Sequence, residues 1–262
     1  MPINNNDPRY YQIGTLSLLL LYGIYYLDFD IRVIVAAIII FSTQLTQFVL
    51  TRLKQLPSFD PRSPLITSLS LCLLLRTESL LIAALAAFLA ISSKFFIRWK
   101  NKHIFNPANL ALVILSLSFD AAWISQGQWG HYVYFAFLTA CFGSLVLYRS
   151  RRMDITLAFL LFYTLLIFGR AIWLGDPFSI PAHQLQSGAL LIFAFFMISD
   201  PKTTPDSRTG RLIFAGAVVL ITGYIQFILY QPNAILYALI IACPLTPFID
   251  KLIPDEKFQW RT

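Results

Sequence analysis

Ten apolar stretches, joined by short polar links, constrain this chain more than any other feature of its sequence. Hydrophobic residues make up 57% of the 262 positions and charged residues only 13%, whereas a soluble protein carries about 25% charged residues. This deficit indicates an all-α polytopic membrane protein with a single integral membrane domain over residues 1–262. The stretches cover residues 10–27, 31–50, 64–76, 79–97, 105–119, 131–148, 154–173, 186–199, 211–230 and 232–249.

The basic residues gather on one side of the membrane if each stretch crosses it once. With the N-terminus in the cytoplasm, 17 of the 20 Lys and Arg residues lie on the cytoplasmic side, and the exceptions are Arg32, Arg76 and Arg170. Membrane proteins keep most Lys and Arg in cytoplasmic loops. We therefore expect both termini in the cytoplasm, in a bacterial cytoplasmic (inner) membrane or a thylakoid membrane. Topology also explains the net charge of +7 without a nucleic-acid partner.

Four of the stretches are shorter than an ordinary membrane helix of roughly 20 residues, and their first residues favour a helix start. Asn106 is a strong N-cap and Pro107 suits the first helical position, so we expect a helix to begin there. Similar or weaker signals for a helix start occur at Ser63-Pro64, Ser187-Gly188 and Gln231-Pro232. If these starts point to the membrane midplane, their N–H groups favour an anionic or hydrogen-bonding ligand. The alternative is that they only start short, tilted helices at the surface.

The stretches divide into two sets of five, a first repeat at 10–119 and a second at 131–249. Length and position relate the two sets more than identical residues do. Because five is odd, the second set would run through the membrane inverted. Paired short segments in two halves are typical of inverted-repeat membrane folds that bind a ligand between the halves. The candidate ligand contacts are Asn106, Asn109, Ser187, Gly188, Asn233 and Asp200.

Ionisable residues are almost absent from the interior of the stretches, which argues against a carboxylate proton relay. Lys94 lies one turn before a cytoplasmic end, and we expect its side chain to extend to the membrane surface as an anchor. Arg76 falls at an outer turn. Residues 200–211 read as a salt-bridged cytoplasmic loop or, alternatively, as the inner mouth of the site. Three His and three Cys lie scattered, so we expect neither a metal site nor a catalytic residue.

Residues 93–113, SKFFIRWKNKHIFNPANLALV, carry a family resemblance, centred on the box Phe105–Asn109. The sequence resembles the membrane subunit family that contains the D subunit of Rnf-type electron transport complexes and the B subunit of sodium-pumping NADH:quinone reductases. The resemblance starts near residue 60. Gly127–Gly130 is closer to a branch that includes membrane proteins of enediyne gene clusters. A second-half pattern also matches, with Ser187-Gly188-Ala189, Phe195 to Pro201, Thr204-Pro205 and Gly210-Arg211.

This resemblance implies ten spans in two inverted repeats, a fold related to urea and ammonium transporters. In electron-transport members of the family, flavin mononucleotide is linked through its phosphate to a threonine in a Ser-Gly-Ala-Thr motif. Here Ser187-Gly188-Ala189 continues with Leu190, and the loop DAAWISQGQWG between the fifth and sixth segments contains no threonine. The resemblance therefore implies no covalent flavin, and a flavin such as flavin mononucleotide or riboflavin would be held non-covalently.

Three functions fit these observations. The first is an electron-transport subunit, or a relative of one, that holds a non-covalent flavin or a quinone between the repeats, with the bilayer and other subunits of a membrane complex as partners. The second is a channel or transporter for a small neutral or weakly anionic solute. The third is a scaffold or assembly subunit without a ligand of its own.

Overall fold

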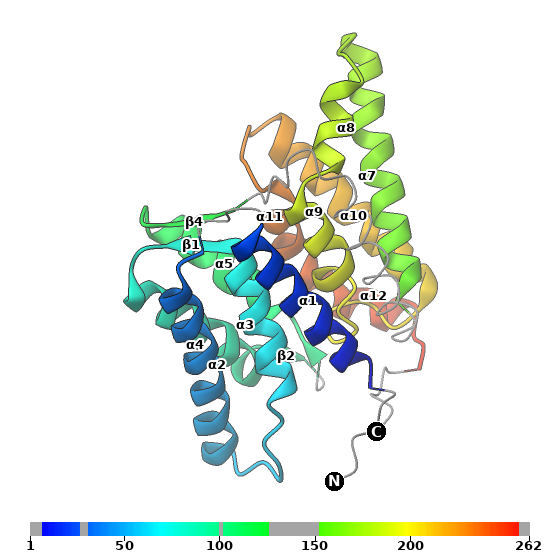
Figure 1. Cartoon of the computed structure of the whole chain (residues 1–262). Coiled ribbons are helices and arrows are strands. Elements are labelled where there is room, and N and C mark those ends of the chain that lie inside the picture. Colours follow the sequence, from blue (N-terminus) through cyan, green and yellow to red (C-terminus); the bar gives the residue numbers. More distant parts are fainter. Residues whose placement is uncertain (1–6, 27–30, 100–101, 126–151, 257–262) are drawn as a thin grey trace. The chain divides into compact units, whose positions relative to one another are not determined.

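The computed structural model describes residues 7–26, 31–99, 102–125 and 152–256 (Figure 1). The chain separates into two compact units. Unit 1 comprises Met1–Gly127 with Trp260–Thr262, and unit 2 comprises Gln128–Gln259. Each unit has its own helices and its own core.

Unit 1 is built from five helices and four short strands within its described residues. α2 packs along α4 and α3, α1 packs on α3, and α4 packs on α5 (Figure 1). Its core contains fully buried aliphatic side chains such as Leu16, Leu71, Ile91 and Leu112. The elements are α1 (Pro8–Tyr25), α2 (Val33–Leu53), α3 (Arg62–Leu74), β1 (Leu75–Thr77), α4 (Leu80–Phe96), β2 (Arg98–Trp99), β3 (Lys102–His103), α5 (Pro107–Ser118) and β4 (Ala122–Ile124).

The two short helices of unit 1 are each followed by an extended segment, and these segments pair with each other. β1 follows α3 directly, β4 follows α5 after a short turn, and the two strands are antiparallel. Leu75 lies opposite Ile124 and Thr77 lies opposite Ala122. The amide of Ser125 also donates to the carbonyl oxygen of Leu74, at 2.8 Å. The backbone beyond both short helices is therefore hydrogen-bonded within the unit.

Unit 2 is all-helical in its described residues. α10 packs on both α7 and α11, and the core holds the fully buried rings of Phe159, Phe193 and Phe214. α7 ends at Gly175, whose φ of 74° is a left-handed conformation that glycine adopts without strain. The elements are α7 (Met153–Leu174), α8 (Ser179–Leu185), α9 (Gly188–Ile192), the π-helix η1 (Phe193–Met197), α10 (Arg208–Phe227), α11 (Ala234–Ala242), the 3₁₀-helix η2 (Cys243–Leu245) and α12 (Thr246–Leu252).

The observed helices confirm a mostly helical, polytopic membrane protein. Nine of the ten predicted apolar stretches coincide with described helices, and the stretch at 131–148 lies outside the described residues. Four of the described helical segments are long and apolar enough to cross a membrane: Val33–Leu53, Met153–Leu174, Arg208–Phe227 and Ala234–Leu252. α8 was not predicted, because its seven residues lie between two apolar stretches and carry no helical apolar pattern of their own.

Two predicted helix starts are wrong in detail. α3 begins at Arg62, before the predicted cap Ser63, because Asp60 accepts a hydrogen bond from the amide of Arg62 at 3.1 Å and starts the turn earlier. α11 begins at Ala234, so Pro232 precedes the helix and does not lie in its first turn. The intervening Asn233 has a φ of 58°, a left-handed conformation that Asn tolerates better than most residues. The presence of a proline was therefore not enough to locate the first residues of α3 and α11.

Four charged side chains fix the starts of α1 and α3 to each other. Asp7 caps α1 and accepts hydrogen bonds from Arg9, and Arg62 reaches it at 2.8 Å. Arg9 also contacts Asp60, at 2.5 Å, and Arg62 contacts Asp60 at 2.8 Å. Burial alone would raise the pKa of Asp60, but hydrogen bonds from Arg62 and the charges of Arg9 and Arg62 outweigh it, and the pKa is lowered. The pKa of Asp7 is lowered in the same way, by Arg9 and Arg62.

Acidification should loosen this four-residue network. A carboxylate with a lowered folded-state pKa stabilises the fold above its unfolded pKa of about 3.9, and this stability is lost as the pH falls through the folded-state value. We expect the melting temperature of the purified protein in detergent to fall below about pH 4. The D7N/D60N variant should melt lower at neutral pH and lose much of this acid dependence. An unchanged acid dependence in D7N/D60N would contradict this assignment.

Candidate functional site

The start of α5 is a buried polar position at the head of an apolar helix. Asn106 is 6% exposed and its side-chain oxygen accepts a hydrogen bond from the amide of Asn109, at 3.1 Å. The carbonyl oxygen of Asn106 accepts the first helical bond from the amide of Leu110, and Pro107 takes the first helical position. The predicted N-cap is therefore confirmed. The cap bond occupies one lone pair of the amide oxygen and leaves the amide group fixed in orientation.

Asn109 brings a second amide to the same turn. Its side chain is fully buried in the first turn of α5, three residues after the cap. An amide offers both N–H donors and a carbonyl acceptor. Buried amides need such partners, because an unbonded polar group out of water is costly. The structure thus brings Asn106 and Asn109 together in the first turn of α5.

The candidate residues of unit 2 lie at two other helix starts. Ser187 is the N-cap residue of α9 and is followed by the buried Gly188, but its hydroxyl makes no capping hydrogen bond. Asn233 is the N-cap residue of α11, also without a side-chain capping bond, and it is partly exposed. Ser187 agrees with the predicted helix start, whereas Asn233 lies two residues after the predicted start at Gln231, and neither side chain makes the capping bond that Asn106 makes.

Asp200 is not brought to Ser187. α9 and η1 together place ten residues of helix between them, which corresponds to about 15 Å along the axis. The Asp200 carboxylate accepts a hydrogen bond from the amide of Lys202 at 2.9 Å, and its carbonyl oxygen accepts from the Thr204 hydroxyl at 3.0 Å. Asp200 therefore organises the loop after η1 and lies away from the start of α9.

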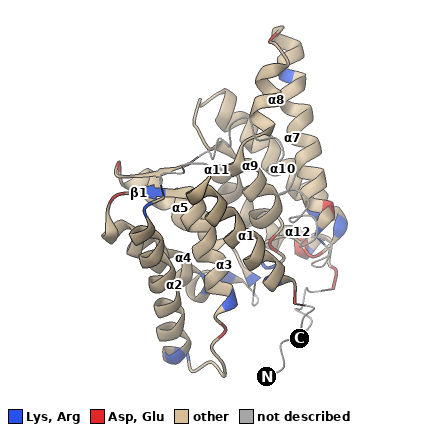
Figure 2. Ribbon diagram, in the orientation of Figure 1, with Lys and Arg blue, Asp and Glu red and all other residues tan. Residues whose placement is uncertain are grey.

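Salt bridges hold the loop at residues 200–211, as its interpretation as a salt-bridged loop predicts. Arg211 pairs with Asp154 at 2.6 Å, and Arg152 donates to the carbonyl oxygen of Pro205 at 2.8 Å. The Asp206 amide donates to the carboxylate of Asp250, also at 2.8 Å. Burial of the guanidinium, as the largest cause, and the nearby positive charge of Arg211 together lower the pKa of Arg152 to about 10. Basic and acidic residues accordingly meet at the start of α7 (Figure 2).

The side chain of Lys94 is buried against the start of α3. It is 7% exposed and its ammonium group donates to the Ser63 carbonyl at 3.2 Å, the Ser63 hydroxyl at 3.0 Å and the Thr67 hydroxyl at 2.7 Å. Ser63 and Thr67 are four residues apart and lie on one face of α3. Lys94 thus joins α4 to α3. The four-residue spacing of Ser63 and Thr67 was the sequence signal for this contact.

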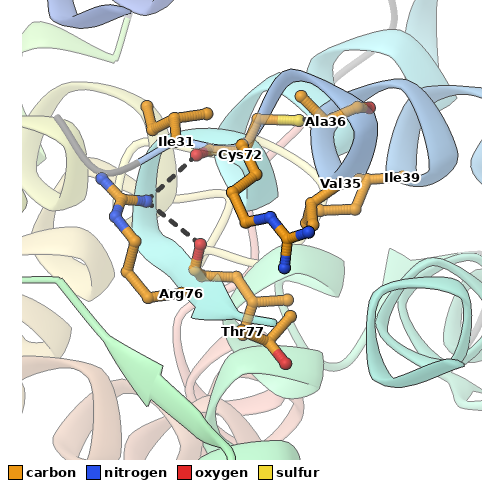
Figure 3. A pocket seen from close by; sticks show the side chains of 9 residues that line it. Ile31, Val35, Ala36, Ile39, Cys72, Arg76 and Thr77 are labelled. Carbon is orange, nitrogen blue, oxygen red and sulfur yellow. Dashed lines mark hydrogen bonds between the residues drawn. The ribbon is translucent and has the colours of Figure 1, made fainter. Parts of the chain in front are cut away.

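Arg76 lies in β1, between α3 and α4, and its side chain is buried. It is 6% exposed, and its guanidinium donates to the carbonyl oxygens of Cys72 at 3.2 Å and Leu75 at 3.0 Å (Figure 3). These are carbonyls at the C-terminal end of α3, where a helix has no amides of its own to pair with them. Arg76 also borders a cleft of about 240 Å³, open mouth included, together with Arg32, Val35 and Thr77.

Known proteins resemble this chain over its second half. The model of the NQR2, RnfD, RnfE family matches residues 122–259, just over half of the chain. The D subunit of the ion-translocating oxidoreductase complex of Escherichia coli K12 / DH10B is 30% identical over 133 residues, which are 50% of this chain and 33% of that protein. The corresponding D subunit of Shigella boydii serotype 18 matches equally. The match thus spans a third of the length of these curated relatives.

The Asn106 cap should carry measurable stability. Asn106→Ala removes the acceptor of the Asn109 amide, and such a loss costs about 1 kcal/mol, or more where water cannot replace it. We expect a lower melting temperature in detergent for Asn106→Ala and a smaller loss for Asn106→Ser, which keeps a capping oxygen. Ser116→Ala is the control, because the Ser116 hydroxyl donates to the Val113 carbonyl within the same helix, α5. Equal stability of Asn106→Ala and Ser116→Ala would show that the cap contributes nothing.

Proposed function

The chain belongs to the NQR2, RnfD, RnfE family, and we propose that it is a membrane subunit of an electron-transport complex that binds a flavin non-covalently. The observation that carries the proposal is the family match over residues 122–259, together with relatives that are named as the D subunit of an ion-translocating oxidoreductase complex. Flavin mononucleotide or riboflavin is the proposed ligand. A quinone, the other redox ligand of this chemistry, is the alternative that the experiment below separates.

The proposed ligand contacts are polar helix starts. In unit 1 they are Asn106 and Asn109, whose buried amides match the alternating carbonyl and N–H groups along the pyrimidine edge of a flavin. In unit 2 they are Ser187, Gly188 and Asn233. Gly188 is buried at the first turn of α9 and has no side chain, so a ligand group can approach the amides there. Asp200 is left out of this contact set because it belongs to the loop beyond η1.

The residues present do not fit covalent attachment at the motif position. The sequence contains one Ser-Gly-Ala, at Ser187–Ala189, which continues with Leu190, and Leu190 is 2% exposed in the core of unit 2. An aliphatic side chain has no hydroxyl to form a phosphoester. A bound flavin would supply one- and two-electron transfer, and the chain would bind it, orient it and exclude water.

We further propose that the two units are inverted repeats at 10–119 and 131–249, within ten membrane segments and with both termini in the cytoplasm. The order of helix lengths supports this relation. α2, α3 and α4, with 21, 13 and 17 residues, have as counterparts α7, α9 with η1, and α10, with 22, 10 and 20 residues. The packing supports it too, because α4 contacts α2 and α5 just as α10 contacts α7 and α11.

A cofactor release experiment tests the flavin. We expect the full chain, purified in mild detergent, to show the visible absorbance bands of an oxidised flavin. After denaturation and filtration the flavin should pass into the filtrate, and the protein band on a denaturing gel should not fluoresce. Asn109→Leu should lower the flavin content per protein, whereas Ser116→Ala should leave it unchanged.

Three results would contradict the proposal in different ways. If the protein contained no flavin and extraction yielded a quinone, the ligand would be a quinone. The proposed role in electron transport would then stand. A fluorescent protein band would mean that a serine or another threonine carries a covalent flavin. Protein with neither redox group would favour a solute channel or a scaffold subunit.

A further inference from the structure

The ends of α2 and α4 form one surface that is both cationic and aromatic. Lys54 follows α2, and its ammonium group lies 5.0 Å from the centroid of the Phe96 ring at the end of α4. Arg52, just before it, lies 5.3 Å from the ring of Phe48. These cation–π contacts hold the charges over rings that stay exposed. We call the region the basic–aromatic surface and define it by Arg52, Lys54, Phe96, Arg98, Trp99 and Lys102.

The hairpin after α4 adds the remaining members of the basic–aromatic surface. β2 and β3 pair with Arg98 opposite His103 and Trp99 opposite Lys102. Directly opposed residues on a strand pair lie side by side on one face. The amide of Ile104 also donates to the Ile97 carbonyl, at 3.3 Å, which closes the hairpin against the end of α4. Trp99 and Lys102 therefore continue the pattern that Phe96 and Lys54 begin.

The two stretches of chain that supply the basic–aromatic surface carry charge of one sign. No Asp or Glu occurs between residues 31 and 59 or between residues 79 and 119, the two stretches that supply this surface. The nearest acid in sequence, Asp60, is engaged by Arg9 and Arg62. A basic position accordingly marks the end of α2 (Figure 2). An anion is therefore the complementary partner.

The exposed aromatic rings indicate which kind of anion the basic–aromatic surface binds. Phe96 is 63% exposed and Trp99 is 53% exposed, and Leu53, next to Lys54 in the chain, is 72% exposed. Apolar and aromatic side chains mixed with Lys and Arg at the ends of membrane helices suit the headgroup region, where rings contact the acyl boundary and cations meet phosphates. We propose that the basic–aromatic surface binds the headgroups of anionic phospholipids such as phosphatidylglycerol.

Trp99 provides a local reporter for a test in lipid nanodiscs. The full chain would carry Phe in place of Trp123, Trp129, Trp173 and Trp260, so that Trp99 alone fluoresces. Phosphatidylglycerol or phosphatidylcholine with brominated acyl chains quenches a tryptophan that it contacts. Competition between the two lipids gives their relative affinity at this position. Inorganic phosphate, added in a separate arm, shows whether a free anion competes with the headgroup.

We expect Trp99 to be quenched several-fold more effectively by brominated phosphatidylglycerol than by the choline lipid. Each Lys or Arg near an anionic surface contributes about fivefold in affinity, so R98Q/K102Q should remove most of the preference. Higher salt should also weaken it. The matched control is R208Q/K251Q, which removes two exposed cations from unit 2 and should leave the preference unchanged.

Three outcomes would overturn the proposal: no preference in the unsubstituted surface, no effect of R98Q/K102Q, or an equal effect of R208Q/K251Q. If the first were found, an acidic protein surface would be the more suitable partner. Full competition by inorganic phosphate would also overturn it, because the surface would then bind the anion and not the lipid. Should R98Q/K102Q fail to fold, R52Q/K54Q removes two cations from the α2 side and makes the same prediction.

Discussion

The rest of the structure depends on one constraint, that backbone polar groups out of reach of water must be hydrogen-bonded by the chain itself. α3 and α5 are 13 and 12 residues long, so they extend about 20 and 18 Å against a hydrocarbon core of about 30 Å. The backbone beyond each of these helices is not helical, so its N–H and C=O groups need other hydrogen-bond partners. The β1–β4 pair, with Arg76 on the last carbonyls of α3, supplies those bonds.

Unit 2 meets the same constraint with hydroxyl groups. The helix α9 widens into the π-helix η1, and the buried Thr156 of α7 donates to the carbonyl oxygen of Ala194 within it, at 2.7 Å. Ser199 likewise donates to the carbonyl oxygen of Phe195. π-helical turns are frequent at functional sites. Short helices therefore come with buried polar side chains, among them Asn106 and Asn109 in the first turn of α5.

The sequence predicted the helical segments well, because apolar runs and N-cap chemistry are local signals. Asn106 was located correctly for this reason. The partners of Lys94 were not predicted, because Ser63 and Thr67 lie on α3, a separate element. The pairing of β1 with β4 was also missed, since three-residue strands carry no periodic pattern. Asp200 and Ser187 were grouped as one site from a family pattern that spans a whole helix and places them at its opposite ends.

Amide hydrogen–deuterium exchange in detergent micelles tests most directly whether the paired strands complete the short helices. The backbone of Leu75–Thr77 and Ala122–Ile124 should exchange slowly, and Arg76→Gln should speed exchange in both segments together, because the pair shares one ladder. Met153–Leu174 provides the reference, and its exchange should not change. Rapid exchange of both strands in the unsubstituted protein, or an effect of Arg76→Gln on neither strand, would contradict the account.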